Sequence, residues 1–202
     1  AKPRHAESKI VLGVIGAGGY VPAMLLPHFK TEGVEFRSIA TASGVSAHDV
    51  GKRFGFAEAV STAEQVLDDK DVNLIVVGTR HDLHAQLARA ALERNKNVFV
   101  EKPLALNDEQ LDAVLEAAAT SSGRLFVGFN RRFSPLAQQA KQLFAKRETP
   151  LSILYRVNAG HIPKEHWTQD PQEGGGRIVG EVCHFIDLMQ FFTGAPTVSV
   201  FA

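Results

Sequence analysis

Short apolar runs alternate with helix-period segments from residue 9 to about residue 128 of the chain. The clearest run is VNLIVVG at residues 72–78, and further runs occupy residues 9–15, 34–40, 97–100 and 125–129. Near-continuous apolar strands that alternate with helices are typical of a parallel sheet covered on both faces. The pattern therefore predicts an α/β fold with a doubly wound parallel sheet.

Apolar residues at three- and four-residue spacing predict helices at residues 16–30, 46–54, 61–69, 82–95 and 107–121. Pro27 is expected to kink the first of them, because proline removes a helical hydrogen bond. Capping patterns predict where three of the others begin: Ser46 with Asp49, Ser61 with Glu64, and Asn107 with Gln110.

The alternation of apolar runs with helix-period segments ends after Phe129. A helix is expected at residues 134–146, with Ser134 as its cap, followed by a β-rich run at 151–159, a polar loop at 160–176, a helix at 178–192 and a strand from residue 197. We therefore expect a tail or linker at residues 1–8, a first domain at 9–130 and the start of a second domain at 131–202.

Charge and cysteine content narrow the class of protein. The 202 residues carry 22 Lys+Arg and 22 Asp+Glu, and 45% of them are hydrophobic, which excludes a disordered chain. Balanced charge gives no electrostatic reason to expect nucleic acid or an anionic membrane as a partner. No apolar run approaches the ~20 residues that span a bilayer, and the start has no signal-peptide pattern. A single cysteine, Cys183, excludes an internal disulfide and fits a cytoplasmic location.

A glycine-rich turn follows the first predicted strand: Gly16-Ala17-Gly18-Gly19-Tyr20-Val21. Gly16 permits a tight turn, and Gly18 lets the backbone approach a pyrophosphate, as in dinucleotide-binding proteins. Val21 replaces the third glycine of that fingerprint, so looser helix–strand packing is expected. Residues 39–44 contain no carboxylate for a ribose, which leaves NAD and NADP both open. An ordinary glycine-rich turn is the alternative interpretation.

Two further segments follow strands, where ligands bind in open α/β sheets. Thr79 and Arg80 come after the strongest run, and His84 lies in the next helical turn, where it could meet a cofactor or cap the helix. Lys102 ends another strand and could hydrogen-bond a substrate hydroxyl and exchange a proton with it. A solvated loop lysine is the alternative.

The segment around His184 holds the last candidate group. Glu181 lies three residues before His184 and Asp187 three after it, so either carboxylate could orient the histidine as an acid/base. A histidine packed on an apolar helix is the alternative. A metal-dependent hydrolase would need an irregular ligand set, and we expect no metal; that set would be His161, His166, Cys183 and His184.

From residue 9 to the end, the chain resembles the Gfo/Idh/MocA oxidoreductases. The motifs that carry the resemblance are GAGGY, TRHDLHAQLARAAL, VFVEKPLAL, VGFNRRFSP and GGGRIVGEVCHFIDL. The segment HWTQDPQEGGGRIVGEVCHFIDL also resembles the branch of the family that is fused behind a zinc-type alcohol dehydrogenase module. The resemblance implies a Rossmann domain followed by an α+β domain with a mostly antiparallel sheet, and hydride transfer between a bound nicotinamide and a sugar or polyol carbon.

Carried across residue by residue, the resemblance implies Lys102 as the catalytic lysine and His184 as the catalytic-site histidine. The cofactor-binding residues it implies are Gly16, Gly18, Gly19, Tyr20, Ser43, Thr79, Arg80, His84, Glu101, Asn130 and Arg131. Many members place an aspartate four residues before the histidine, and here that position is Gly180. Glu181 could substitute through its longer side chain, or the base is Lys102 or His184 alone.

The expected function is that of an NAD(P)-dependent oxidoreductase acting on a hydroxyl or carbonyl carbon of a sugar, sugar nucleotide or polyol. The alternative is a catalytically silent dinucleotide- or sugar-binding module, because the aspartate is missing. About 70 residues remain for the second domain, fewer than the ~100–150 typical of a domain. We therefore expect a truncated chain, or a sheet completed by a homo-oligomer or by a fused upstream domain.

Overall fold

The computed structural model describes residues 9–201, so the predicted tail or linker at residues 1–8 lies outside the described residues. The chain divides into two compact units, Ala1–Val127 and Gly128–Ala202, and each is described by itself.

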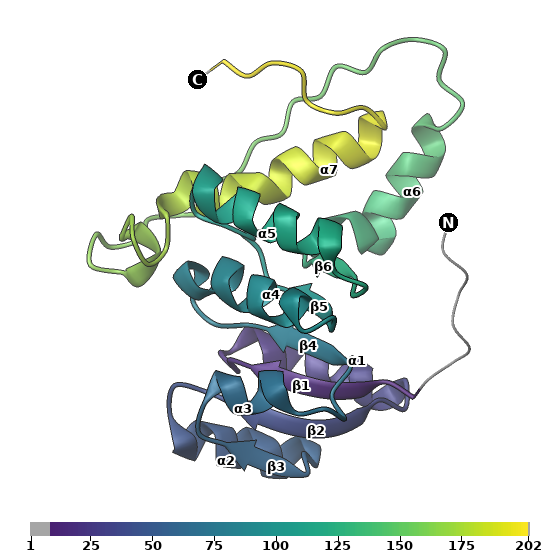
Figure 1. The fold of residues 1–202 in the computed structure, drawn as a ribbon. Helices are drawn as coiled ribbons and strands as arrows, with labels where there is room; N and C mark the ends of the chain where they lie inside the picture. The colour runs from purple at the N-terminus through teal and green to yellow at the C-terminus, as the bar shows by residue number, and fades with distance from the viewer. Residues whose placement is uncertain (1–8, 202) are drawn as a thin grey trace. The chain divides into compact units, whose positions relative to one another are not determined.

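The first unit contains one six-stranded sheet in the order β3-β2-β1-β4-β5-β6, with every strand parallel to its neighbours (Figure 1). The strands are β1 (Val11–Ile15), β2 (Glu35–Ala40), β3 (Glu58–Val60), β4 (Leu74–Val77), β5 (Asn97–Val100) and β6 (Leu125–Val127). The strand order reverses between β1 and β4, which makes the position between these two strands the switch point of a Rossmann-type sheet. The predicted doubly wound α/β fold is confirmed.

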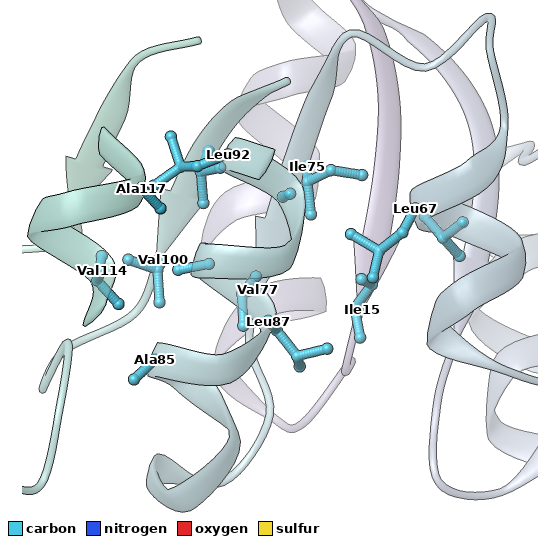
Figure 2. Close-up of a cluster of buried hydrophobic side chains, with 14 of the residues drawn as sticks. Ile15, Leu67, Ile75, Val77, Ala85, Leu87, Leu92, Val100, Val114 and Ala117 are labelled. Atoms are coloured by element: carbon cyan, nitrogen blue, oxygen red, sulfur yellow. The ribbon is translucent and has the colours of Figure 1, made fainter. Parts of the chain in front are cut away.

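Helices cover both faces of the sheet. They are α1 (Leu26–Thr31), α2 (Gly44–Phe54), α3 (Ala63–Asp68), α4 (His84–Glu93) and α5 (Asp108–Thr120). Along β4, Val76 joins a buried cluster with Leu26 of α1 and Phe54 of α2. Its neighbours Ile75 and Val77 point the other way, into the cluster formed with α3, α4 and α5 that Figure 2 shows. Alternate residues of one strand thus supply two cores.

The helix starts differ in part from the sequence prediction. Asn107 caps α5 as expected, since its side chain accepts a hydrogen bond from the Gln110 amide at 2.9 Å. The predicted Ser46 cap is wrong, because α2 begins two residues earlier, after an extended Ser43. The predicted Ser61 cap is also wrong, because Thr62 forms the capping box instead, one residue later.

The predicted helix at residues 16–30 is interrupted. A π-helical turn, Val21–Leu25, precedes α1, and Pro27 lies in the first turn of α1. This arrangement suits proline, which has no backbone N–H to donate to the preceding turn.

The second unit consists of helices and irregular segments. Its elements are a 3-10 turn (Asn130–Phe133), α6 (Pro135–Phe144), a 3-10 turn (Trp167–Gln169), a π-helical turn (Ile178–Val182) and α7 (Cys183–Thr193). Ser134 caps α6 as predicted, accepting from the Ala137 amide at 3.2 Å.

The strands expected at residues 151–159 and from residue 197 are not formed, and no antiparallel sheet occurs within residues 128–201. A strand needs a neighbour to pair with, and these runs have none among the described residues. Their apolar side chains are instead exposed, as at Leu154 and Val198. Among residues 9–201, the helices are too short or too polar to cross a bilayer.

Candidate functional site

Three candidate segments begin side by side at the carboxyl edge of the sheet. Ile15 at the end of β1 pairs in register with Val77 at the end of β4, and Val77 pairs with Val100 at the end of β5. The glycine turn follows β1, Thr79 and Arg80 follow β4, and Glu101 and Lys102 follow β5. Residues far apart in the sequence therefore gather where ligands bind in this class of sheet.

The three glycines of the turn after β1 have different surroundings: one is packed against the protein backbone, and two face open space. Gly16 has φ +83°, and a Cβ there would lie 2.6 Å from the Thr79 amide nitrogen. At Gly18 only the Gly78 carbonyl oxygen lies within 4 Å of such a Cβ, at 3.9 Å, and at Gly19 nothing does. The fold itself requires Gly16, whereas Gly18 and Gly19 keep a space clear beside the backbone.

Close packing between the first helix and the sheet is retained, contrary to the expectation drawn from Val21. Val21 is only 1% exposed, and a Cβ on Gly78 would collide with its side chain. The close approach is permitted by Gly78, directly after β4, and not by a glycine in the helix. Sequence reasoning missed Gly78, although a glycine at the end of a buried strand is a signal of close backbone approach.

The region after β2 contains Ser43, which is exposed and immediately precedes α2. Its carbonyl oxygen accepts hydrogen bonds from the Thr41 hydroxyl at 2.5 Å and from the Ala47 amide at 3.1 Å. Because β2 is paired in register with β1, Ser43 follows a strand end next to the glycine turn.

His84 is buried rather than presented at the surface. It is 1% exposed, and its Nδ1 and Nε2 lie 2.7 Å from the Pro103 carbonyl oxygen and 3.2 Å from the Thr79 carbonyl oxygen. Burial lowers the pKa of His84, so the neutral ring, with one N–H, is favoured. The His84 ring thus lies between the loop that carries Thr79 and the loop that carries Lys102, and the neutral ring donates to one of the two carbonyl oxygens.

Glu101 and Lys102 extend the line of β5. The Glu101 amide donates to the Val77 carbonyl at 3.0 Å, and the Lys102–Pro103 peptide is cis. Within the described part of the chain, Oε1 of Glu101 is buried without a hydrogen-bond partner. Burial raises the pKa of Glu101 to about 7, and the neighbouring Lys102 charge opposes that rise. An orphaned carboxyl oxygen at this edge is suited to receive a hydrogen bond from a ligand.

In the second unit, His184 lies in the first turn of α7 and is 9% exposed. The ring of Phe129 meets the imidazole edge-on, with 6.1 Å between ring centroids. Asn130 and Arg131 are exposed, and the Arg131 guanidinium lies over the ring of Phe185 at 5.2 Å.

Both carboxylates that could orient His184 are paired with arginines. Glu181 accepts from Nε and Nη2 of Arg177, at 3.1 and 2.8 Å. Arg177 also donates to the Gly160 carbonyl at 2.8 Å, and the two paired side chains line a cavity of about 420 Å³. Asp187 is paired with Arg132. The spacing of four residues between Arg177 and Glu181 could have revealed the first pair; Arg132 and Asp187 are 55 residues apart.

The ligand set that a metal-dependent hydrolase would need does not come together in the described residues; it is His161, His166, Cys183 and His184. No group of three or more His, Cys, Asp or Glu side chains within residues 9–201 could hold a metal ion.

Comparison with known proteins identifies the lineage. Residues 10–129 match the family described as "Oxidoreductase family, NAD-binding Rossmann fold", which covers more than half of the chain. The chain belongs to the Gfo/Idh/MocA family.

Two curated relatives are similar to this Gfo/Idh/MocA chain. Oxidoreductase P35 of Formosa agariphila is 28% identical over 198 residues, which cover 93% of this chain and 62% of that protein. Levoglucosan dehydrogenase of Pseudarthrobacter phenanthrenivorans is 28% identical over 184 residues, covering 86% and 44%. The chain therefore spans about half the length of the relatives it matches.

A solved structure agrees with this assignment. A levoglucosan dehydrogenase in complex with NADH is 25% identical and superimposes with a TM-score of 0.76 over 93% of this chain and 54% of that one. The residues of this Gfo/Idh/MocA chain fit such a dinucleotide: space is clear beside Gly18 and Gly19, and the Glu101 carboxyl oxygen is buried without a partner in the described chain.

Proposed function

We propose that this chain is the nucleotide-binding part, with the start of a second domain, of an NAD(P)-dependent oxidoreductase. Its substrate is a sugar, sugar nucleotide or polyol, oxidised or reduced at a hydroxyl or carbonyl carbon. The observation that carries the proposal is the placement of the glycine turn and of Lys102 at the ends of β1 and β5, on either side of β4. The name of the levoglucosan dehydrogenase relative supports a sugar-like substrate.

The first unit supplies the cofactor contacts in this proposal. When bound, the nicotinamide accepts or donates the hydride. Gly16, Gly18, Gly19 and Tyr20 hold the pyrophosphate region, because Gly16 permits the tight turn and Gly18 and Gly19 keep the space beside the backbone open. Ser43 lies near the adenosine ribose, Thr79 and Arg80 line the middle of the cofactor, and Glu101 contacts its nicotinamide end. We give His84 a place between the loops of Thr79 and Lys102 rather than a direct cofactor contact, since its ring nitrogens lie beside the carbonyl oxygens of Thr79 and Pro103.

Proton transfer is assigned to Lys102 and His184. In reduction, the Lys102 ammonium donates a hydrogen bond to the substrate oxygen and gives it a proton as the hydride arrives; in oxidation, the neutral Lys102 amine takes the hydroxyl proton as the hydride leaves. His184 takes part in proton transfer, and Asn130 and Arg131 contact the cofactor; these assignments rest on the family resemblance. Glu181 does not replace the missing aspartate in this proposal, because Arg177 occupies its carboxylate.

Replacing Lys102 tests the assignment. After titration with NADH and NADPH identifies the tighter cofactor, a panel of sugars and polyols identifies a substrate. Lys102→Ala is expected to lower kcat by about 100-fold or more, the usual contribution of a positioned acid/base, and to leave the cofactor Kd within about twofold. Lys70→Ala, at an exposed position, is the matched control. Unchanged turnover of Lys102→Ala would overturn the role given to Lys102.

A catalytically silent dinucleotide- or sugar-binding module is the second candidate. It is favoured by Gly180 in place of the aspartate and by the pairing of Glu181 with Arg177. Tight cofactor binding without turnover of any compound in the panel would support this candidate against the first.

Self-association and a cytoplasmic location complete the proposal. Exposed apolar side chains in the second unit, among them Leu154, Val198 and Phe201, favour a covering partner, which is a second copy or a fused domain. Light scattering coupled to gel filtration tests the first of these, and a concentration-independent monomer would contradict it. The cytoplasmic location rests on the single cysteine and the neutral charge.

A further inference from the structure

One face of the helical segment that carries His184 is buried within the second unit. Its buried residues recur at three- and four-residue spacing: Gly180, His184, Asp187 and Leu188. Asp187 is 6% exposed, which is unusual for a carboxylate and requires a partner. His184 and Asp187 therefore share one face of the helix, one turn apart.

The segment at residues 129–132 contacts that face at successive turns. The ring of Phe129 meets the His184 imidazole edge-on, with 73° between the ring planes. Three residues further on, Arg132 forms a fork with Asp187, in which Nε donates to Oδ2 at 2.9 Å and Nη2 donates to Oδ1. The Arg132 guanidinium also lies over the ring of Phe191 at 5.8 Å, so this one side chain contacts two turns of α7.

The fork fixes more than a single contact would. Two parallel hydrogen bonds between a planar guanidinium and a carboxylate define both the distance and the orientation of the groups. The hydrogen bonding that Arg132 donates to the Asp187 carboxylate raises the pKa of Arg132, which keeps the guanidinium charged. The backbone of Arg132 is held as well, because Nε2 of Gln138 in α6 donates to its carbonyl at 2.7 Å.

We propose that Arg132 and Asp187 are positioning residues that set the place of the His184 ring. The fork holds α7 against residues 129–132 one turn beyond His184, and Phe129 then contacts the imidazole from the same segment. Neither residue touches the reacting atoms in this proposal. It rests on the proposed role of His184 in proton transfer.

Conservative variants test the fork in the full chain. Arg132→Lys keeps the charge and loses the second hydrogen bond, and Asp187→Asn keeps the shape and loses the charge. Both are expected to lower kcat at least tenfold with the substrate KM within about threefold. The pH dependence of kcat is expected to contain a transition that His184→Gln abolishes. The apparent pKa of that transition is expected to shift in both variants. Arg89→Lys, in the exposed Arg89–Glu93 pair of α4, is the control and leaves kcat and the profile unchanged.

A measurement that does not depend on turnover separates the two proposals. The ring resonances of His184 are assigned by their loss in His184→Gln and are followed by proton–carbon NMR. Displaced His184 resonances in Arg132→Lys and Asp187→Asn, but not in Arg89→Lys, support the positioning role even where the parent shows no turnover and the proposed oxidoreductase function fails. Should Asp187→Asn not fold, Arg132→Lys decides. His184 resonances and titration that match the parent in the folded variants overturn the positioning proposal, whatever the activity.

Discussion

The two units of this chain use apolar residues in different ways. In the first unit, each strand pairs within the sheet, and helices on both faces complete two buried clusters. In the second, the buried apolar residues of the described chain are only Ala137 and Leu188, while Leu136 and Leu143 of α6 are more than three-quarters exposed. Helix α6 nevertheless forms, with its Ser134 cap in place. Local signals are thus enough to define a helix, whereas a core needs partner elements that only the first unit supplies.

The same substitution in both units gives the largest expected contrast. Leu12→Ala, at a fully buried position of β1, should lower the free energy of unfolding by about 3–5 kcal/mol, through lost burial and the cavity left behind. Leu143→Ala on α6 should change it by less than about 0.5 kcal/mol, since the side chain is already exposed. Urea unfolding followed by far-ultraviolet circular dichroism measures both.

This contrast depends on Leu143 remaining exposed in solution. If Leu143→Ala costs as much as Leu12→Ala, or if its cost grows with protein concentration, the face of α6 is covered by a partner. Repeating the unfolding at two concentrations a hundredfold apart distinguishes an isolated second unit from an associated one.

A second pair of variants separates folding from ligand binding inside the first unit. Gly16→Ala places a Cβ 2.6 Å from the Thr79 amide in a backbone conformation that disfavours it, so a loss of about 2–4 kcal/mol is expected. Gly19→Ala meets no protein atom within 4 Å and should preserve stability, but its methyl group would fill the space assigned to the pyrophosphate. Thermal unfolding should therefore show a loss of stability in Gly16→Ala alone, and NADH fluorescence titration should show weakened binding in Gly19→Ala without that loss. Unimpaired NADH binding by Gly19→Ala would argue against that placement of the cofactor.

The comparison of units also explains which features the sequence could predict. Strand β5 was predicted at its observed bounds because its signal is local: three of its four residues are apolar, and the run lies directly before Glu101 and Lys102. Strand β3 was missed because it has three residues and a mostly exposed pattern at the edge of the sheet. The gathering of Gly16, Thr79 and Lys102 was predictable because each follows a strand of a parallel sheet, and the carboxyl ends of such strands share one edge. The partner of Asp187 depends on packing between segments 55 residues apart, which no local pattern encodes.

Glu101 gives a smaller, pH-dependent effect in the well-packed unit. Its folded-state pKa of about 7 lies above the ordinary value of 4.5 for a glutamate side chain, so the folded protein holds the proton more tightly than the unfolded chain. The stability from this group is present below pH 4.5 and is lost as the pH rises to about 7. Glu101→Gln cannot ionise, and it should be more stable than the parent by about 1–2 kcal/mol at pH 8, a value reduced for partial exposure, and equal to it near pH 4.5. Unfolding free energies at the two pH values check this, and an equal difference at both would contradict the assigned cause.

The smallest effect concerns the helix caps, which both units form equally well. Asn107→Ala at α5 and Ser134→Ala at α6 each remove one side-chain hydrogen bond to a backbone amide, at a cost of about 1 kcal/mol. The chain has one tryptophan, Trp167 in the second unit, whereas the strands found within residues 9–201 all lie in the first. Tryptophan fluorescence therefore follows the second unit, and the strand contribution to circular dichroism follows the first. If the units unfold independently, Ser134→Ala shifts only the fluorescence transition and Asn107→Ala only the other. Coincident shifts of both transitions in either variant would instead show that the two units unfold as one, so that the sparse core of the second is supported by the first.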